Sequence, residues 1–103
     1  LSGGGPIMHP GLDAVVLVPM YPHALSSRPI VVDCNSTIRI DILSRNSIHP
    51  PLTCDCQVNM TARPGDSVVV CKKPHPLTLL HPEGHSFYAS CRDKLRWGDA
   101  LVN

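Results

Sequence analysis

Apolar residues in this chain occur in short runs, and proline, glycine or turn-forming polar residues separate one run from the next. Residues 14–18 are continuously apolar, which is typical of a strand covered on both faces. Residues 30–32 form a second short run. Residues 37–42 alternate, with isoleucine at every second position and polar residues between. This period of two predicts a strand with one polar face.

The second half of the chain also consists of short apolar or alternating runs. Residues 52–58 alternate again, with Cys54 and Cys56 on the apolar side and with Asp55 and Gln57 on the polar side. This pattern predicts one strand that turns both thiols toward the core.

Two further runs predict strands. Residues 63–66 have proline and glycine at their centre, which predicts a turn in which Asp66 bonds the backbone. The apolar run at residues 67–71 follows and predicts a buried strand. Residues 76–82 are apolar between two prolines and predict one more strand.

The pattern changes near the C-terminus. Phe87, Tyr88, Cys91 and Leu95 fit a helical spacing, and Gly98 is suited to the end of the helix. Several short strands followed by one short helix predict an all-β, sandwich-like fold in a single domain over residues 1–103.

Length and composition agree with this prediction. The chain has 103 residues, including 11 prolines and seven glycines, which favours short elements joined by turns. Its net charge of +1 gives no electrostatic case for binding nucleic acid or an anionic membrane. Apolar runs are too short for a membrane-spanning helix, since the longest is broken by Pro19.

The five cysteines are an odd number, which argues against a closed disulfide framework and favours buried thiols in a reducing compartment. A zinc site at Cys54 and Cys56 is disfavoured, because the spacing is shorter than C-x₂₋₄-C and no second pair follows. The glycines of residues 3–5 fit no phosphate-binding spacing and predict a turn. Composition and spacing therefore predict no metal site and no catalytic residue.

A different class of protein also fits some of these patterns. Many strands, together with the glycosylation acceptors at Asn35 and Asn59, are compatible with a secreted immunoglobulin-like binding module. The order of residues disagrees, because Trp97 follows every cysteine and Tyr88 lies three residues before Cys91.

An ordered set of motifs resembles the NAD kinase family. "LSGGGPIMHPGLDA" is similar to the second half of the family motif TPTGSTAYxLSAGGPIxxPxLDA, and "LVPMYPHALSSRPIVV" to the P-x-x-PHxLxxRPxVV that follows it. "CDCQ" stands where the family has D-G-Q or D-S-Q, and "PGDSVVV" resembles its G-D-x-V strand. "LLHPEGHSFYASCRDKLRWG" is similar to the tail LIHP…KLxWG of bacterial members.

The resemblance implies that this chain is the C-terminal domain of such a kinase, which in the family is all-β and sandwich-like. It also implies that the TPTGSTAY segment and the N-terminal α/β domain with its GGDG loop are absent from this chain. The aspartate of GGDG is the family's catalytic base, so we expect the chain to be inactive alone.

The family transfers a phosphoryl group from ATP or polyphosphate to the 2′-hydroxyl of the adenosine ribose of NAD, with a divalent metal such as Mg²⁺. The resemblance implies the same for the full-length enzyme, with a cytoplasmic location and a homodimer or homotetramer as the assembly. For this domain it implies NAD binding and subunit contacts, with no metal held by the domain itself. A purely structural assembly domain is the alternative within the family.

Four residues match family positions that contact NAD. Ser2 matches the last serine of TAYxLS, on the nicotinamide side, and Gln57 matches the glutamine of D-G-Q. Asp55 precedes Gln57 by two residues, and Tyr21 lies where the family places a residue of variable identity that lines the substrate. Cys56 departs from the glycine or serine usual in that element, which predicts a different local backbone.

Overall fold

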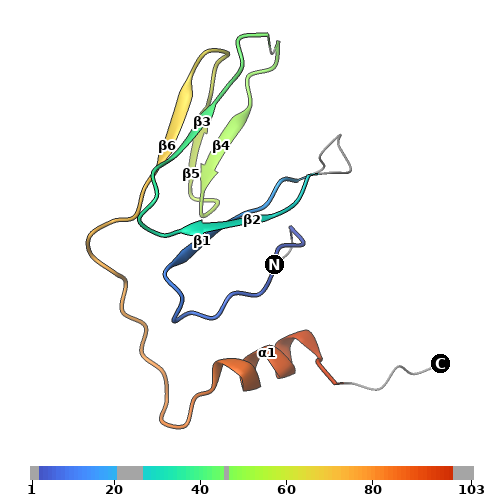
Figure 1. The fold of residues 1–103 in the computed structure, drawn as a ribbon, viewed down its shortest axis with the longest axis vertical. Helices are drawn as coiled ribbons and strands as arrows, with labels where there is room; N and C mark the ends of the chain where they lie inside the picture. The colour runs from blue at the N-terminus through green and yellow to red at the C-terminus, as the bar shows by residue number, and fades with distance from the viewer. Residues whose placement is uncertain (1–2, 21–26, 46, 99–103) are drawn as a thin grey trace, which may run out of the picture.

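The computed structural model describes residues 3–20, 27–45 and 47–98 (Figure 1). The described chain forms six short strands and one C-terminal helix, which confirms the all-β class with a short terminal helix. The elements are β1 (Ala14–Leu17), β2 (Ile30–Asp33), β3 (Ile38–Asp41), β4 (Pro51–Cys54), β5 (Val58–Thr61), β6 (Ser67–Val70) and α1 (Phe87–Leu95).

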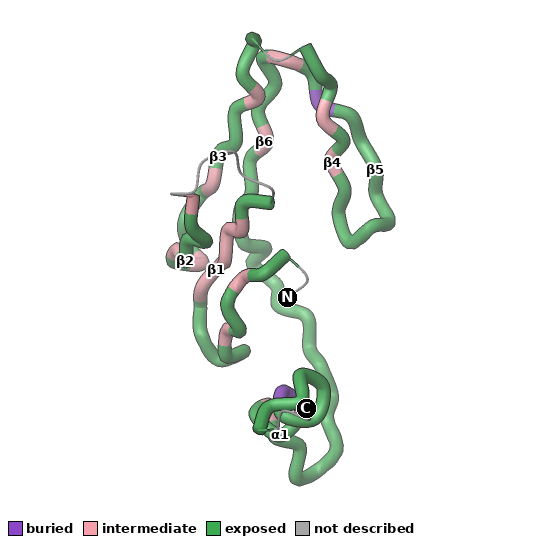
Figure 2. The backbone as a smooth tube through the Cα atoms, turned by 90° about the vertical axis from the view of Figure 1, so that its right-hand side faces the viewer, coloured by how far each residue is buried: buried purple, intermediate pink, exposed green. Residues whose placement is uncertain are grey.

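The strands associate as three separate antiparallel pairs: β1 with β2, β3 with β6, and β4 with β5. Ala14 lies opposite Asp33 in the first pair, and Asp41 lies opposite Ser67 in the second. Among the described elements, each strand contacts its own partner and no other strand or helix. Figure 2 shows the three ribbons as distinct arms, with α1 beyond them.

A turn at residues 63–66 lies at the end of the β3–β6 ribbon, where the Ile42 N–H donates to the Asp66 carbonyl at 2.8 Å and the Gly65 N–H to the Ile42 carbonyl at 2.8 Å. The Arg63 backbone N–H donates to the Asp66 carboxylate at 2.8 Å, and the Asp66 N–H donates back to the Arg63 carbonyl at 3.0 Å. Gly65 has a φ of 90°, a value that L side chains rarely adopt. This turn, with Asp66 bonding the backbone, is as the sequence predicts.

The prediction of one strand over residues 52–58 is wrong. The chain reverses at Asp55 and Cys56, whose φ values are 51° and 57°, and the Gln57 N–H donates to the Cys54 carbonyl at 2.9 Å. Positive φ at both central residues is what a tight hairpin requires. Because the alternation of residue types continues through the turn, the period alone did not reveal it.

The prediction of a strand at residues 76–82 is also wrong. These residues have no ladder partner in the described chain, and Leu77, Leu79 and Leu80 are 85%, 69% and 92% exposed. Pro76 and Pro82 lie at the two ends of the segment and have no N–H to donate. A sheet would therefore gain few hydrogen bonds here.

The described residues enclose very little core. Ala62 and Cys91 are the buried apolar residues among them, and large apolar side chains on every ribbon are exposed (Figure 2). The surface of 9500 Å² compares with roughly 5,700 Å² for a compact chain of this mass. The radius of gyration of 17.7 Å compares with about 13 Å for a compact domain of this length.

This openness corrects the sequence predictions about burial. The run at residues 14–18 is half-buried instead of covered on both faces, and β6 is mostly exposed. Cys54, Cys56 and Cys71 are exposed, whereas Cys91 is buried. The reason is that each ribbon has two faces and the described chain supplies no second layer to cover them.

Helix α1 covers the residues that the spacing predicts, but it is capped by Arg96 and not by the predicted Gly98. The Ser86 hydroxyl accepts a hydrogen bond from the Ala89 N–H at 3.4 Å, and Arg96 ends the helix with a φ of 58°. The ring of His9 lies 5.5 Å from Phe87 and 5.6 Å from Tyr88 between centroids. The N-terminal segment therefore contacts the first turn of the helix.

Cys56→Gly should strengthen the β4–β5 hairpin. A non-glycine residue at positive φ costs about 1–2 kcal/mol, and glycine removes most of that cost. We expect amide hydrogen exchange of Leu52 and Met60, which lie opposite each other in the ladder, to slow by about fivefold when measured by NMR, which is about 1 kcal/mol.

Gly65→Ala is the matched control, because a Cβ at Gly65 meets no atom within 4 Å and its φ of 90° leaves strain as its main effect. That change should accelerate exchange near the 63–66 turn. Unchanged or faster exchange in Cys56→Gly would contradict a strained Cys56.

Candidate functional site

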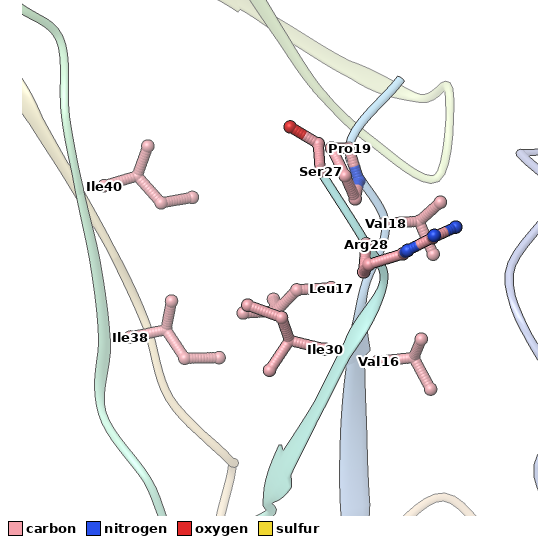
Figure 3. Close-up of a pocket in the computed structure, with 9 residues that line it drawn as sticks. All are labelled: Val16, Leu17, Val18, Pro19, Ser27, Arg28, Ile30, Ile38 and Ile40. Atoms are coloured by element: carbon pink, nitrogen blue, oxygen red, sulfur yellow. The ribbon is translucent and has the colours of Figure 1, made fainter. Parts of the chain in front are cut away.

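An open apolar hollow of about 740 Å³ lies between the β1–β2 ribbon and β3 (Figure 3). Leu17 and Ile30 extend from one side toward Ile38 and Ile40 on the other. Its volume falls in the range of small-molecule sites. Its lining residues are Val16, Leu17, Val18, Pro19, Ser27, Arg28, Ile30, Ile38 and Ile40.

Strand alternation places the two faces of β1 in different surroundings. All of these residues line the hollow, but Leu17 is directed toward Ile38, whereas the side chains of Val16, Val18 and Arg28 are directed away from it (Figure 3). A Cβ on Gly5 would come within 2.6 Å of Val18 Cγ2 and 3.8 Å of Val16 Cγ1. The glycine run is therefore more than a turn: Gly5 permits the N-terminal segment to pack directly on β1.

Two of the four predicted NAD contacts, Ser2 and Tyr21, lie outside the described residues. Their described neighbours are close together, because a Cβ on Gly3 would lie 3.6 Å from Val18 Cγ1 and 4.0 Å from Met20 Cγ. The N-terminal segment and the chain after β1 thus adjoin, as a shared binding site would require.

The other two predicted contacts, Asp55 and Gln57, are exposed in the turn of the β4–β5 hairpin. The Gln57 side chain therefore belongs to a turn and not to the polar face of a strand as predicted. In the described chain neither β4 nor β5 contacts β1 or β2. The turn brings Asp55 and Gln57 together with each other, since the Gln57 N–H donates to the Cys54 carbonyl at 2.9 Å.

A charged group on the β3–β6 ribbon was not singled out from the sequence. Asp41 Oδ1 accepts hydrogen bonds from the Ser67 hydroxyl at 2.6 Å and from Arg39 Nε at 2.8 Å. The Ser67 hydrogen bond, followed by that of Arg39, lowers the pKa of Asp41 below its usual value. The alternation of residues 37–42 indicates that Asp41 lies on a polar face. It does not identify Ser67, 26 residues away, as the hydrogen-bond partner.

One ion pair joins two ribbons. Lys72 Nζ lies 3.1 Å from Asp13 Oδ1, so it links the residue after Cys71 to the residue before β1. The hydrogen bond from Lys72 to Asp13 is the main cause that raises the pKa of the lysine. Because both side chains are largely exposed, we assign this pair an orienting role with little stabilisation.

Metal-binding groups do not gather in the described chain: nowhere in residues 3–20, 27–45 and 47–98 do three His, Cys, Asp or Glu side chains come together around one position. The donor set present therefore does not fit the Mg²⁺ implied by the resemblance, and no chemical step is assigned to that ion here. Within the same residues, no helix is both long and apolar enough to cross a membrane.

Comparison with known proteins identifies the family. Residues 1–81 match the ATP-NAD kinase C-terminal domain family, so the chain belongs to that family. It is 60% identical to an NAD kinase of Hahella chejuensis over 97% of its length, and 60% identical to one of Teredinibacter turnerae over 100%. It is 56% identical to an NAD kinase of Pseudomonas putida over 98% of its length.

The chain spans about a third of the length of these relatives, since it covers 34%, 35% and 34% of them respectively. Membership of this family confirms the resemblance drawn from the ordered motifs. It also excludes the alternative of a secreted immunoglobulin-like module.

Ser67→Ala should raise the pKa of Asp41, because it removes the hydrogen bond with the largest effect on the carboxylate. NMR titration of the Asp41 side-chain carboxyl should show its pKa closer to 3.8, the ordinary value of an aspartate. Since the folded-state pKa is lowered, this group stabilises the fold above pH 3.8 and loses that effect as the pH falls below it.

The control is Ser90→Ala on α1, which has no contact with Asp41. A Ser67→Ala titration that coincides with the wild-type curve would show that the 2.6 Å hydrogen bond does not hold in solution.

Proposed function

We propose that this chain is the NAD-binding and assembly portion of an NAD kinase, an enzyme that transfers a phosphoryl group from ATP or polyphosphate to the 2′-hydroxyl of the adenosine ribose of NAD. The observation that carries the proposal is the 60% identity to NAD kinases over 97–100% of the chain. The motifs shared with the family run through the chain in the same order.

In this proposal Ser2, Tyr21, Asp55 and Gln57 contact NAD. An exposed hairpin turn supports the assignment of Gln57 and Asp55, because a ligand can reach both side chains without displacing a packed residue. A glutamine amide both donates and accepts hydrogen bonds, as recognition of a dinucleotide requires. The adjoining N-terminal and post-β1 segments support Ser2 and Tyr21 as members of one site.

The catalytic base and the divalent metal, Mg²⁺, are assigned to the part of the enzyme that this chain does not contain. Phosphoryl transfer depends on positioning and on neutralising charge at the phosphates. The contribution proposed for this chain is to bind NAD and hold its ribose in position. The site requires other parts of the enzyme for the transfer itself.

Subunit contacts are the second part of the proposal, with a cytoplasmic homodimer or homotetramer as the assembly and neither nucleic acid nor membrane as a partner. The exposed apolar surface supports it. Monomeric proteins rarely leave large contiguous apolar patches uncovered, so such faces indicate contact with other protein. Exposed apolar residues include Ile40 on β3, Val69 on β6 and Leu80 in the segment before α1.

Gln57→Ala should weaken NAD binding in an enzyme made by joining this chain to an N-terminal GGDG-bearing half that ends in TPTGSTAY. Loss of one hydrogen bond of roughly 1–1.5 kcal/mol predicts an increase in the KM for NAD of about tenfold. Steady-state assay of NADP formation measures this, and kcat should change by less than about twofold.

Asn59→Ala is the matched control, an exposed amide two residues along on β5 that we expect to leave KM unchanged. Equal KM values for wild type and Gln57→Ala would remove Gln57 from the site. A joined protein that folds and yet never phosphorylates NAD would refute the proposed activity.

The isolated chain should form no NADP from NAD, ATP and Mg²⁺ above a control without protein, because the proposed base is not among its residues. A coupled spectrophotometric assay with the purified chain tests this. Formation of NADP would place the base within residues 1–103. Self-association without any affinity for NAD, measured by ultracentrifugation and calorimetry, would favour the assembly-only alternative.

A further inference from the structure

The tip of the β4–β5 hairpin carries two cysteines on either side of one residue, and nothing in the proposed kinase function uses them. Cys54 is the last residue of β4 and Cys56 lies in the turn. Both thiols are free and exposed, unlike the buried Cys91. Exposed thiols are the ones that small reagents in solution can reach.

The backbone conformation between the two cysteines is one that favours a short separation. Asp55, between them, has a φ of 51°, close to the value of a left-handed helical residue. Helical geometry of either hand separates the Cα atoms of residues i and i+2 by about 5.4 Å. This separation lies inside the range of roughly 4.4–6.8 Å over which disulfides form.

The backbone holds this arrangement before any reaction. The Gln57 N–H donates to the Cys54 carbonyl at 2.9 Å, and Cys54 lies opposite Val58 in the ladder. The chain is therefore reversed at the cysteine pair by hydrogen bonds on both sides of the turn. A thiol pair held in this way needs less ordering to close a ring than a pair in an unfolded chain.

We propose that Cys54 and Cys56 form a redox-active dithiol that a small-molecule disulfide, of the class of oxidised glutathione, converts reversibly into an intrahairpin disulfide. This proposal does not depend on NAD binding. A zinc ion is not the expected occupant, because a structural zinc site takes four ligands and the described chain gathers no third one here.

The reaction is a thiol–disulfide exchange in two steps. The thiolate of one cysteine attacks the small-molecule disulfide, forming a mixed disulfide and releasing one small thiolate. The thiolate of the other cysteine then attacks the protein sulfur of that mixed disulfide and releases the second small thiolate. Two protons leave the protein thiols and protonate the two leaving thiolates, so one disulfide is reduced as one is formed.

The product should be easy to reduce. A disulfide that is exposed to solvent and closes a small ring has a higher reduction potential than a buried structural one. Small thiols therefore return the pair to the dithiol, and the hairpin tip responds to the balance of thiol and disulfide around it.

The test incubates the full chain with oxidised glutathione, blocks remaining thiols by alkylation and measures the intact mass. We expect Cys54 and Cys56 both to be lost to alkylation while neither retains glutathione, whatever adduct the exposed Cys71 carries. Cleavage before aspartate separates Cys54, on residues 41–54, from Cys56, on residues 55–65, and leaves Cys71 on residues 66–92. The first two peptides should stay linked until reductant is added.

Three comparisons make the result specific. Cys54→Ser and Cys56→Ser should each retain a glutathione adduct at the remaining cysteine, as the exposed Cys71 does in the wild type. Cys71→Ser is the matched control and should leave the 54–56 link unaffected. In concentrated urea the link should accumulate more slowly, because the turn is lost.

The proposal would be overturned by stable, separate glutathione adducts on Cys54 and Cys56, or by no reaction at either thiol. A link from either cysteine to Cys71 in place of the 54–56 link, or an equal rate of closure in urea, would also overturn it.

Discussion

Backbone hydrogen bonding between pairs of four-residue strands is the interaction on which this structure depends. Each ribbon satisfies the N–H and C=O groups along one edge of its two strands, and turns such as that of Arg63 and Asp66 fix the register. Burial contributes little within the described chain, since Ala62 and Cys91 are its buried apolar residues. Order here comes from strand pairing, and the apolar side chains remain available to other protein surfaces.

The predominance of strand pairing over burial bears on where the candidate site lies. Side chains at turns and strand ends are not needed for strand pairing, and Gln57, proposed above to contact NAD, lies in such a turn. The apolar hollow between Leu17 and Ile38 is open because no second layer closes it. The β1–β2 ribbon therefore has the glycine segment packed near one face and an open hollow on the other.

Local chemistry made part of the fold predictable from the sequence. Alternation predicted the strand around Arg39, and the spacing of Phe87, Cys91 and Leu95 predicted the helix, because these signals act over a few residues. The turn at Cys56 was hidden because the alternation of residue types ran through it. The strand expected around Leu79 failed because prolines remove donors and pairing needs a partner that no local pattern can specify. The link of Asp41 to Ser67 was likewise invisible, since it depends on which distant strand pairs with β3.

The β4–β5 hairpin lies between β3 and β6 in sequence, and this nesting implies an order of assembly. Cys54 and Val58 are separated by a three-residue turn, whereas Ile38 and Val70 are far apart in sequence. A hairpin closes in about 1–10 μs, and loop-closure entropy makes the distant pairing slower until the intervening chain has shortened. The β4–β5 hairpin therefore forms first and brings β3 and β6 close together. If its turn forms slowly, the pairing of β3 with β6 is delayed as well.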